Sequence, residues 1–147
     1  MSDAEGFFVD SNVLLYYVDP LESGKRQRAM DWIDNLWVAG SGRLSWQVLH
    51  EFYWNAVRKM RLEPGKAREI VGYLAHWKPV DTSLGLIEQA WHWMDSAQLS
   101  YWDSLILAAA QRSGARYLLS EDFQSNREYD QILVLNPFTS SPSAFLA

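Results

Sequence analysis

The sequence predicts an α/β protein of three layers, with a parallel sheet of five strands between layers of helices. Five short runs of residues that favour β-structure alternate with longer runs whose apolar residues recur every three or four positions. Glycine and proline stand between several of these runs, where connections between elements are expected. This alternation predicts parallel strands, because each helix returns the chain to the edge of the sheet from which the previous strand began.

The first half of the chain contributes two expected strands and two expected helices. The apolar residues 7–9 predict a short buried strand. A helical pattern follows over residues 22–38 and ends just before Gly40, a residue type that favours helix ends. Residues 43–45 predict the second strand, and the apolar spacing of residues 46–60 predicts the helix after it.

The second half contributes three expected strands and three expected helices. Pro64 begins one helical pattern and Gly114 ends another, in the positions that each residue type favours. The expected helices are residues 64–77, 84–97 and 101–113, and the expected strands are residues 79–81, 116–119 and 132–135.

Composition indicates one globular domain over residues 1–147. The 147 residues are 48% hydrophobic with a net charge of −5, which excludes a disordered chain. The Ser- and Pro-rich residues 139–147 are expected to form a loosely held tail. Cysteine is absent, which excludes disulfides, a Cys-ligated zinc and a thiol nucleophile. The first five residues are acidic where a secretory signal would be basic, so we expect a cytoplasmic protein without a membrane segment.

Four acidic residues from separate parts of the chain are expected at one edge of the sheet. Asp10 ends the first strand, and Glu51 lies in the second turn of the helix after the second strand. Asp103 begins a helix whose other end joins the next strand through two residues, and Asp122 follows that strand directly. In sheets of this class ligands bind where the carboxyl ends of the strands meet. The topology therefore predicts a carboxylate cluster at that edge.

Clustered carboxylates repel one another and require protons or cations as compensation. Without Cys or His among them, the oxygen donors favour Mg²⁺ or Mn²⁺ over zinc. Such ions activate water and neutralise charge on phosphate, so the pattern indicates phosphodiester hydrolysis. Without these four acids the chain has 13 basic against 14 acidic residues, so its acidity does not exclude a nucleic acid substrate.

Each acid also has an ordinary structural interpretation. Asp10 could be a turn residue at a strand end, and Glu51 could belong to the solvated face of its helix. Ser100 and Asp103 have the spacing of a helix capping box. Asp122 could lie in an exposed loop. Their expected meeting at one edge is what favours a metal site.

Four segments resemble the motifs of the PIN domain, and in particular those of VapC toxins. They are FFVDSNVLLY (7–16), SWQVLHEF (45–52), YWDSLILAAA (101–110) and LLSEDF (118–123). The resemblance extends from residue 7 to about residue 138. It implies a Mg²⁺- or Mn²⁺-dependent ribonuclease that acts on RNA, is inhibited by a small antitoxin, and forms a homodimer as relatives commonly do.

The resemblance also implies roles for eight positions. The metal-binding and catalytic acids fall on Asp10, Glu51, Asp103 and Asp122, and supporting positions fall on Ser11, Asn12, Ser120 and Glu121. Asn12 matches a residue that orders the site by hydrogen bonding, and Ser11 keeps the hydroxyl of the threonine found in many relatives. Whether Glu121 or Asp122 is the fourth acid stays open.

The alternative function is a catalytically silent PIN-fold module that binds RNA or a protein partner. The presence of all four acids favours the enzyme.

Overall fold

The computed structural model describes residues 5–146 and contains a five-stranded sheet. Its strands are β1 (Gly6–Val9), β2 (Gly42–Arg43), β3 (Ala115–Leu119), β4 (Glu128–Tyr129) and β5 (Ile132–Leu135). Across the sheet their order is β2-β1-β3-β5-β4, and only β4 and β5 pair in antiparallel orientation. β1 lies between β2 and β3, with Phe7 opposite Gly42 on one side and Tyr117 on the other.

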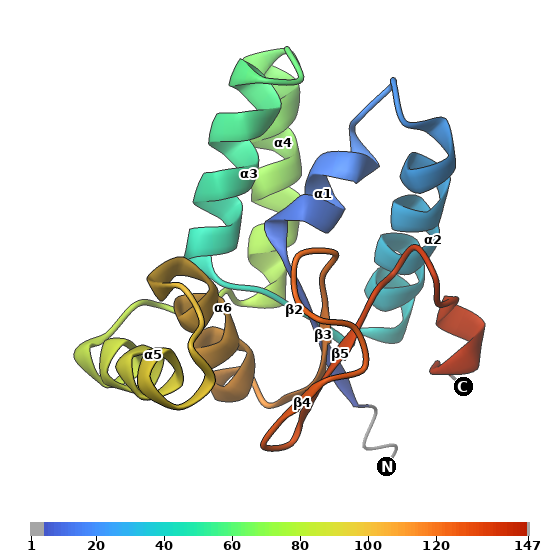
Figure 1. Cartoon of the computed structure of the whole chain (residues 1–147). Coiled ribbons are helices and arrows are strands. Elements are labelled where there is room, and N and C mark those ends of the chain that lie inside the picture. Colours follow the sequence, from blue (N-terminus) through green and yellow to red (C-terminus); the bar gives the residue numbers. More distant parts are fainter. Residues whose placement is uncertain (1–4, 147) are drawn as a thin grey trace.

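Helices cover both faces of this sheet, with α5 and α6 on one side and α1 and α2 on the other (Figure 1). α3 and α4 form a packed pair that extends past the edge where β1 ends. The helices are α1 (Ser11–Tyr17), α2 (Ser23–Ala39), α3 (Trp46–Arg58), α4 (Pro64–Leu74), α5 (Leu84–Ala97) and α6 (Tyr101–Arg112), with 3-10 turns η1 (Ala75–Trp77) and η2 (Pro142–Ala144). The three-layer α/β/α class predicted from the sequence is confirmed.

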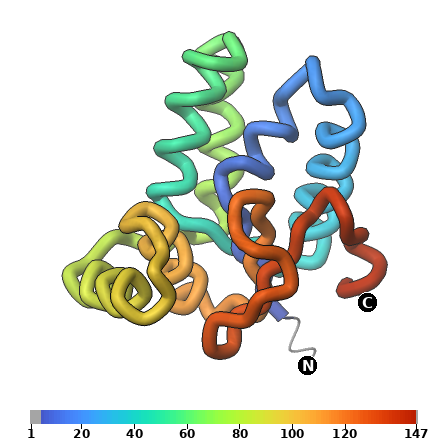
Figure 2. Tube along the Cα trace, viewed as in Figure 1, coloured from blue at the N-terminus to red at the C-terminus, as the bar shows by residue number. Residues whose placement is uncertain are grey.

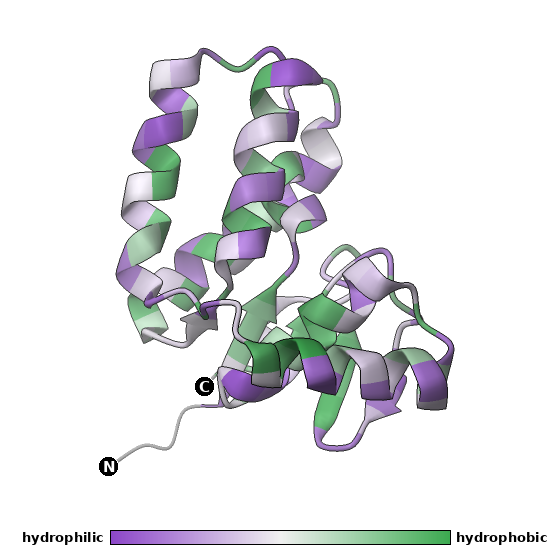
Figure 3. Cartoon of the chain, turned by 90° about the vertical axis from the view of Figure 1, so that its left-hand side faces the viewer, coloured by the Kyte–Doolittle hydropathy of each residue, from purple (hydrophilic) through white to green (hydrophobic). Residues whose placement is uncertain are grey.

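The core lies on both faces of the central strands. Every residue of β1 is buried, and Trp32 of α2 is completely enclosed beside Phe7, at a ring-centroid distance of 5.7 Å. Figure 3 shows the strands as mainly hydrophobic and the helices as mixed. Burial on both faces explains why the strands have continuous apolar runs instead of alternation.

The prediction of a strand at residues 79–81 is wrong. Only an isolated parallel bridge joins Ser45 to Val80, through the Val80 N–H to the Leu44 carbonyl and the Trp46 N–H to the Val80 carbonyl. Lys78 is the next residue before Val80 that would face this strand, and its backbone is left-handed (φ +55°), so the extended conformation and the ladder do not continue there. The fifth strand is instead β4, a two-residue antiparallel partner of β5 that was not predicted.

Helix α1 was also not predicted. Asp10 is its N-cap, with Oδ1 accepting a 2.7 Å hydrogen bond from the Ser11 N–H. The helix has seven residues, so it spans two turns and offers too little periodicity to be recognised from apolar spacing.

The C-terminal segment runs alongside α2 (Figure 2). The indole Nε1 of Trp32 donates to the carbonyls of Pro137 at 3.0 Å and Ser140 at 3.1 Å. The Phe145 ring lies 5.4 Å from that of Tyr117, between centroids. These contacts join the last residues that the structure describes to α2 and β3. Over residues 5–146, no helix is long and apolar enough to cross a membrane.

Candidate active site

The candidate site lies where β1 and β3 end. The Asp10 N–H donates to the Leu119 carbonyl at 3.0 Å, and the Ser120 N–H donates to the Leu135 carbonyl at 3.1 Å. Asp10 therefore extends the pairing of β1 with β3 by one residue, and Ser120 extends the pairing of β3 with β5 by one residue. Their side chains meet at the carboxyl edge, beside the start of α1.

Asp10 is the most enclosed acid of the site, with 5% of its surface exposed. Its Oδ2 accepts hydrogen bonds from the Ser120 hydroxyl at 2.8 Å and from Nδ2 of Asn12 at 3.3 Å. Burial raises the pKa of the Asp10 carboxyl to about 7; hydrogen bonds from Ser120 and Ser11 oppose the rise, and the charges of Glu51 and Asp122 add to it.

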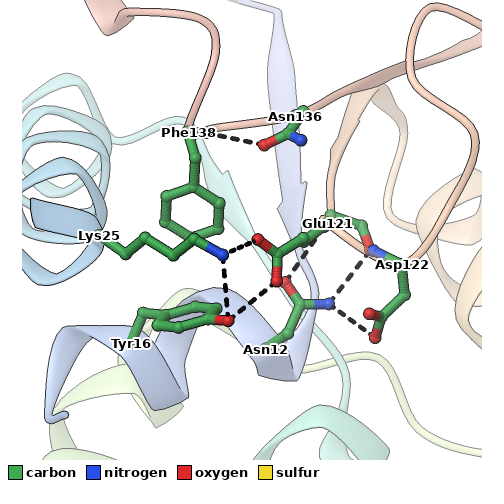
Figure 4. Close-up of polar contacts among 8 residues, drawn as sticks. Asn12, Tyr16, Lys25, Glu121, Asp122, Asn136 and Phe138 are labelled. Atoms are coloured by element: carbon green, nitrogen blue, oxygen red, sulfur yellow. Dashed lines mark hydrogen bonds and ion pairs between the residues drawn. The ribbon is translucent and has the colours of Figure 1, made fainter. Parts of the chain in front are cut away.

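Asn12 connects the two loops of the site. Its Nδ2 lies 3.2 Å from the Ser120 hydroxyl and 3.1 Å from Oδ2 of Asp122, besides its contact with Asp10. Its Oδ1 accepts a hydrogen bond from the Glu121 N–H at 3.2 Å. Figure 4 shows Asn12 between the Glu121 and Asp122 side chains. This amide therefore fixes the loop after β3 relative to α1.

Glu51 reaches the site from α3. Its Oε1 accepts a 3.2 Å hydrogen bond from the Ser11 hydroxyl. Burial raises the pKa of Glu51, hydrogen bonds from Ser11 and Gln47 oppose the rise, and the charges of Asp103 and Asp122 add to it. The Ser11 hydroxyl thus links Glu51 to the loop that carries Asp10.

Asp103 lies in the first turn of α6, and its N–H donates to the Ser100 hydroxyl at 3.1 Å. The Ser100 cap expected from the sequence is present. Burial raises the pKa of Asp103, a hydrogen bond from Ser100 opposes the rise, and the charge of Asp122 adds to it. The Asp103 carboxylate is thus close enough to Asp122 for electrostatic repulsion between them. Asp103 therefore belongs both to the capped first turn of α6 and to the acidic site.

Asp122 and Glu121 follow β3 and take different positions. The Asp122 N–H donates to the Ser120 hydroxyl at 3.1 Å, and its carboxylate interacts electrostatically with Asp10, Glu51 and Asp103. Glu121 instead contacts Lys25 and Tyr16. Lys25 and Tyr16 were not predicted to lie at the site; Lys25 is 96 positions away from Glu121, and no motif joins them.

The donor chemistry fits a hard divalent cation. All four acids offer carboxylate oxygens, and Asp10, Glu51 and Asp103 all have raised pKa values, as expected where buried negative charge lacks compensation. Over residues 5–146, no three acidic or histidine side chains are already gathered closely enough to bind one ion. The fit therefore rests on the type of donor, the carboxylates of Asp10, Glu51, Asp103 and Asp122.

A separate apolar groove of about 270 Å³ lies between α1, α2, α3 and α4. None of the four acids lines it. Trp37 and Tyr73 stand at the groove with 44% and 58% of their surfaces exposed. The remaining lining residues are Leu14, Tyr17, Ile33, Asp34, Phe52, Ile70 and Leu74.

A model of a known protein family matches most of this chain. It is the model of the PIN domain, which matches residues 7–128; this range includes β2, β3, most of β1 and all four acids. No curated protein sequence matches the chain significantly.

Proposed function

Because the chain belongs to the PIN domain family, whose members are generally nucleases, we propose that it is a Mg²⁺- or Mn²⁺-dependent endoribonuclease. The observation that carries this proposal is the buried Asp10 carboxylate, which shares one sheet edge with Glu51, Asp103 and Asp122. The cost of burying an acid there is compensated if a cation binds among the four carboxylates.

The side chains have distinct parts in this proposal. Asp10, Glu51, Asp103 and Asp122 would hold the metal. A bound Mg²⁺ or Mn²⁺ supplies activation of water and stabilisation of charge on the phosphate. The hydroxyls of Ser120 and Ser11 hold Asp10 and Glu51 in place, and Asn12 holds Asp122.

We further propose that the protein is the toxin of a type II toxin–antitoxin pair, of the VapC kind that its four motifs resemble. Supporting this, the groove beside Trp37 and Tyr73 exposes aromatic surface that a small antitoxin could cover. Two of the helices that line the groove also reach the acidic edge, since Asp10 caps α1 and α3 carries Glu51. A cytoplasmic location and a homodimer complete the proposal.

RNA cleavage by the purified protein tests the enzymatic part. Cleavage is expected with Mg²⁺ or Mn²⁺ and is expected to stop on chelation. Full cleavage in excess EDTA contradicts the proposal, and absence of cleavage by a folded, metal-loaded protein favours the silent binding module.

Expression in a bacterial host tests the toxin part. We expect growth arrest by the chain alone and relief by co-expression of the neighbouring small reading frame, with a stable complex between the two proteins. Normal growth with abundant folded protein contradicts the toxin proposal while leaving the nuclease proposal intact.

A further inference from the structure

Two consecutive acids after β3 point to different surroundings. The Asp122 carboxylate lies with Asn12 on the side of the acidic site. The Glu121 carboxylate lies on the other side of Asn12, toward Lys25 and Tyr16 (Figure 4). Chain geometry alone does not decide which of two adjacent acids enters a site, so contacts made by the side chains must decide it.

Both carboxylate oxygens of Glu121 are engaged. Oε1 accepts a hydrogen bond from the Tyr16 hydroxyl at 3.0 Å, and Oε2 forms an ion pair with Nζ of Lys25. Lys25 also donates to the Tyr16 hydroxyl at 3.3 Å. The three groups thus form a closed triangle in which the charge of Glu121 is neutralised.

Lys25 is held in position by aromatic rings. Its Nζ lies 4.7 Å from the centroid of the Tyr16 ring and 5.3 Å from that of Phe138. Cation–π attraction of this kind favours one position of a long side chain. Lys25 comes from α2, Tyr16 from α1, and Phe138 from the segment after β5. Three separate parts of the chain therefore meet around Glu121.

We propose that Lys25 and Tyr16 are positioning residues that hold Glu121 out of the acidic site and so leave Asp122 as the acid contributed by this loop. This inference rests on the proposed nuclease function. Without Lys25, Glu121 would carry an uncompensated charge next to Asp122, and either carboxylate could then approach a bound cation. Two acids competing for one ligand position would disturb the geometry that catalysis needs.

Metal binding separates the two acids. Mn²⁺ is titrated by calorimetry into the full-length protein and its Glu121→Gln and Asp122→Asn variants. Asp122→Asn is expected to weaken Mn²⁺ binding by more than about tenfold. Glu121→Gln is expected to change it by less than about fivefold, since Gln still accepts from Tyr16 and partly exposed ion pairs contribute little. Equal losses in both variants overturn the proposal.

Substitution of the lysine tests its role in positioning. Lys25→Met is expected to lower the cleavage rate about tenfold while Mn²⁺ affinity is kept or increased, because a free carboxylate is now available. The double variant with Glu121→Gln is expected to recover cleavage. Recovery of cleavage in the double variant would show that Lys25 acts by positioning Glu121. If Lys25→Met instead lowered cleavage through lost packing, the added Glu121→Gln change would not restore it. Arg116→Met is the matched control, since Arg116 forms a similar surface ion pair with Glu128.

Amide hydrogen exchange supplies a reading that needs neither cleavage nor metal. The Glu121 and Asp122 N–H groups are bonded to Asn12 and Ser120, so Lys25→Met is expected to speed their exchange more than Arg116→Met does. Unchanged exchange and unchanged cleavage in Lys25→Met overturn the positioning role. If the wild-type protein neither binds Mn²⁺ nor cleaves RNA, the proposed function fails, and exchange alone decides the positioning.

Discussion

The Ser120 hydroxyl donates a 2.8 Å hydrogen bond to Oδ2 of Asp10, and both side chains are buried at the ends of neighbouring strands. Their 110-residue separation in the chain makes this contact a consequence of the pairing of β1 with β3. The sheet therefore places a poorly solvated carboxyl beside a donor that favours its charged form. Burial outweighs this donor, because the pKa of Asp10 is raised to about 7.

The raised pKa predicts that the metal-free protein loses stability as the pH rises. Folded Asp10 keeps its proton up to about pH 7, whereas the unfolded chain releases it near the ordinary value of 3.8. The folded state binds more protons in this interval, so the contribution of Asp10 is fully present below about pH 4 and is lost as the pH rises through 7. The loss amounts to up to about 4 kcal/mol, at about 1.4 kcal/mol per pKa unit.

Asp10→Asn isolates this contribution from other titrating groups. Chemical unfolding in EDTA between pH 5 and 8 is expected to show the variant gaining stability relative to wild type up to about pH 7, and a constant difference above it. A difference that does not change with pH would show that Asp10 titrates normally.

Asp103→Asn is expected to abolish cleavage while the fold is kept. Ser100, not Asp103, supplies the cap oxygen of α6, so replacing the carboxylate leaves this cap intact. Loss of a negative ligand should lower RNA cleavage by orders of magnitude, and the Tm of the metal-free protein should hold or rise as repulsion is relieved.

The control is Ser83→Ala, which removes the cap of α5, where the Ser83 hydroxyl accepts from the Leu86 N–H at 3.2 Å. It should lower the free energy of unfolding by about 0.5–2 kcal/mol and spare cleavage. Near-normal cleavage by folded Asp103→Asn would remove this acid from the active site.

Long helices were the most predictable part of the fold. The range 84–97 is reproduced by α5, which begins after a serine cap and has a clear apolar face. The predicted range of the last helix, 101–113, agrees with α6 within one residue, because Ser100 caps its start and Gly114 follows its end. The failures were short: α1, with two turns, and β4, with two residues, depend on tertiary contacts that leave little local pattern.

The acids of the site could be placed at one edge because topology fixes where strands end and helices begin. Their partners could not be predicted in the same way. Lys25 reaches Glu121 only because α2 packs beside α1, and the contact with Phe138 depends on the path of the chain after β5. Spacing along the sequence contains no information on such contacts.

Asn12→Asp is expected to destabilise the metal-free protein at pH 8. The amide Nδ2 lies within 3.3 Å of oxygen atoms of Asp10, Ser120 and Asp122, so an oxygen in its place turns donation into repulsion. Loss of such contacts costs about 1–3 kcal/mol in the free energy of unfolding. The same change at the exposed Asn35 of α2, which bonds the Asp31 carbonyl, should cost about 0.5 kcal/mol or less. Equal effects at the two positions would show that Asn12 does not organise the acids.

The composition of the C-terminal segment predicts that it is loosely held, whereas the structure packs Phe145 against the core. Substitution of Phe145 can decide between the two. Phe145 has 37% of its surface exposed, and its ring lies near those of Trp32 and Tyr117. Because of these contacts, Phe145→Ala should lower the free energy of unfolding by about 1–2 kcal/mol, the value of partly burying a large apolar side chain.

Trp91→Ala provides the comparison for this last prediction, since Trp91 on α5 is also a large aromatic residue and is 50% exposed. Urea unfolding of both variants measures the difference. A larger effect at Phe145 means that the segment after β5 adds to the core around Trp32. Because Phe138, which packs on Lys25, lies between β5 and Phe145, an anchored segment would also help to hold Lys25 against Glu121. Equal small effects at both positions would instead mean that residues 139–147 are loosely held, and Phe138 would then depend on Asn136, whose side-chain oxygen accepts from its N–H at 2.9 Å.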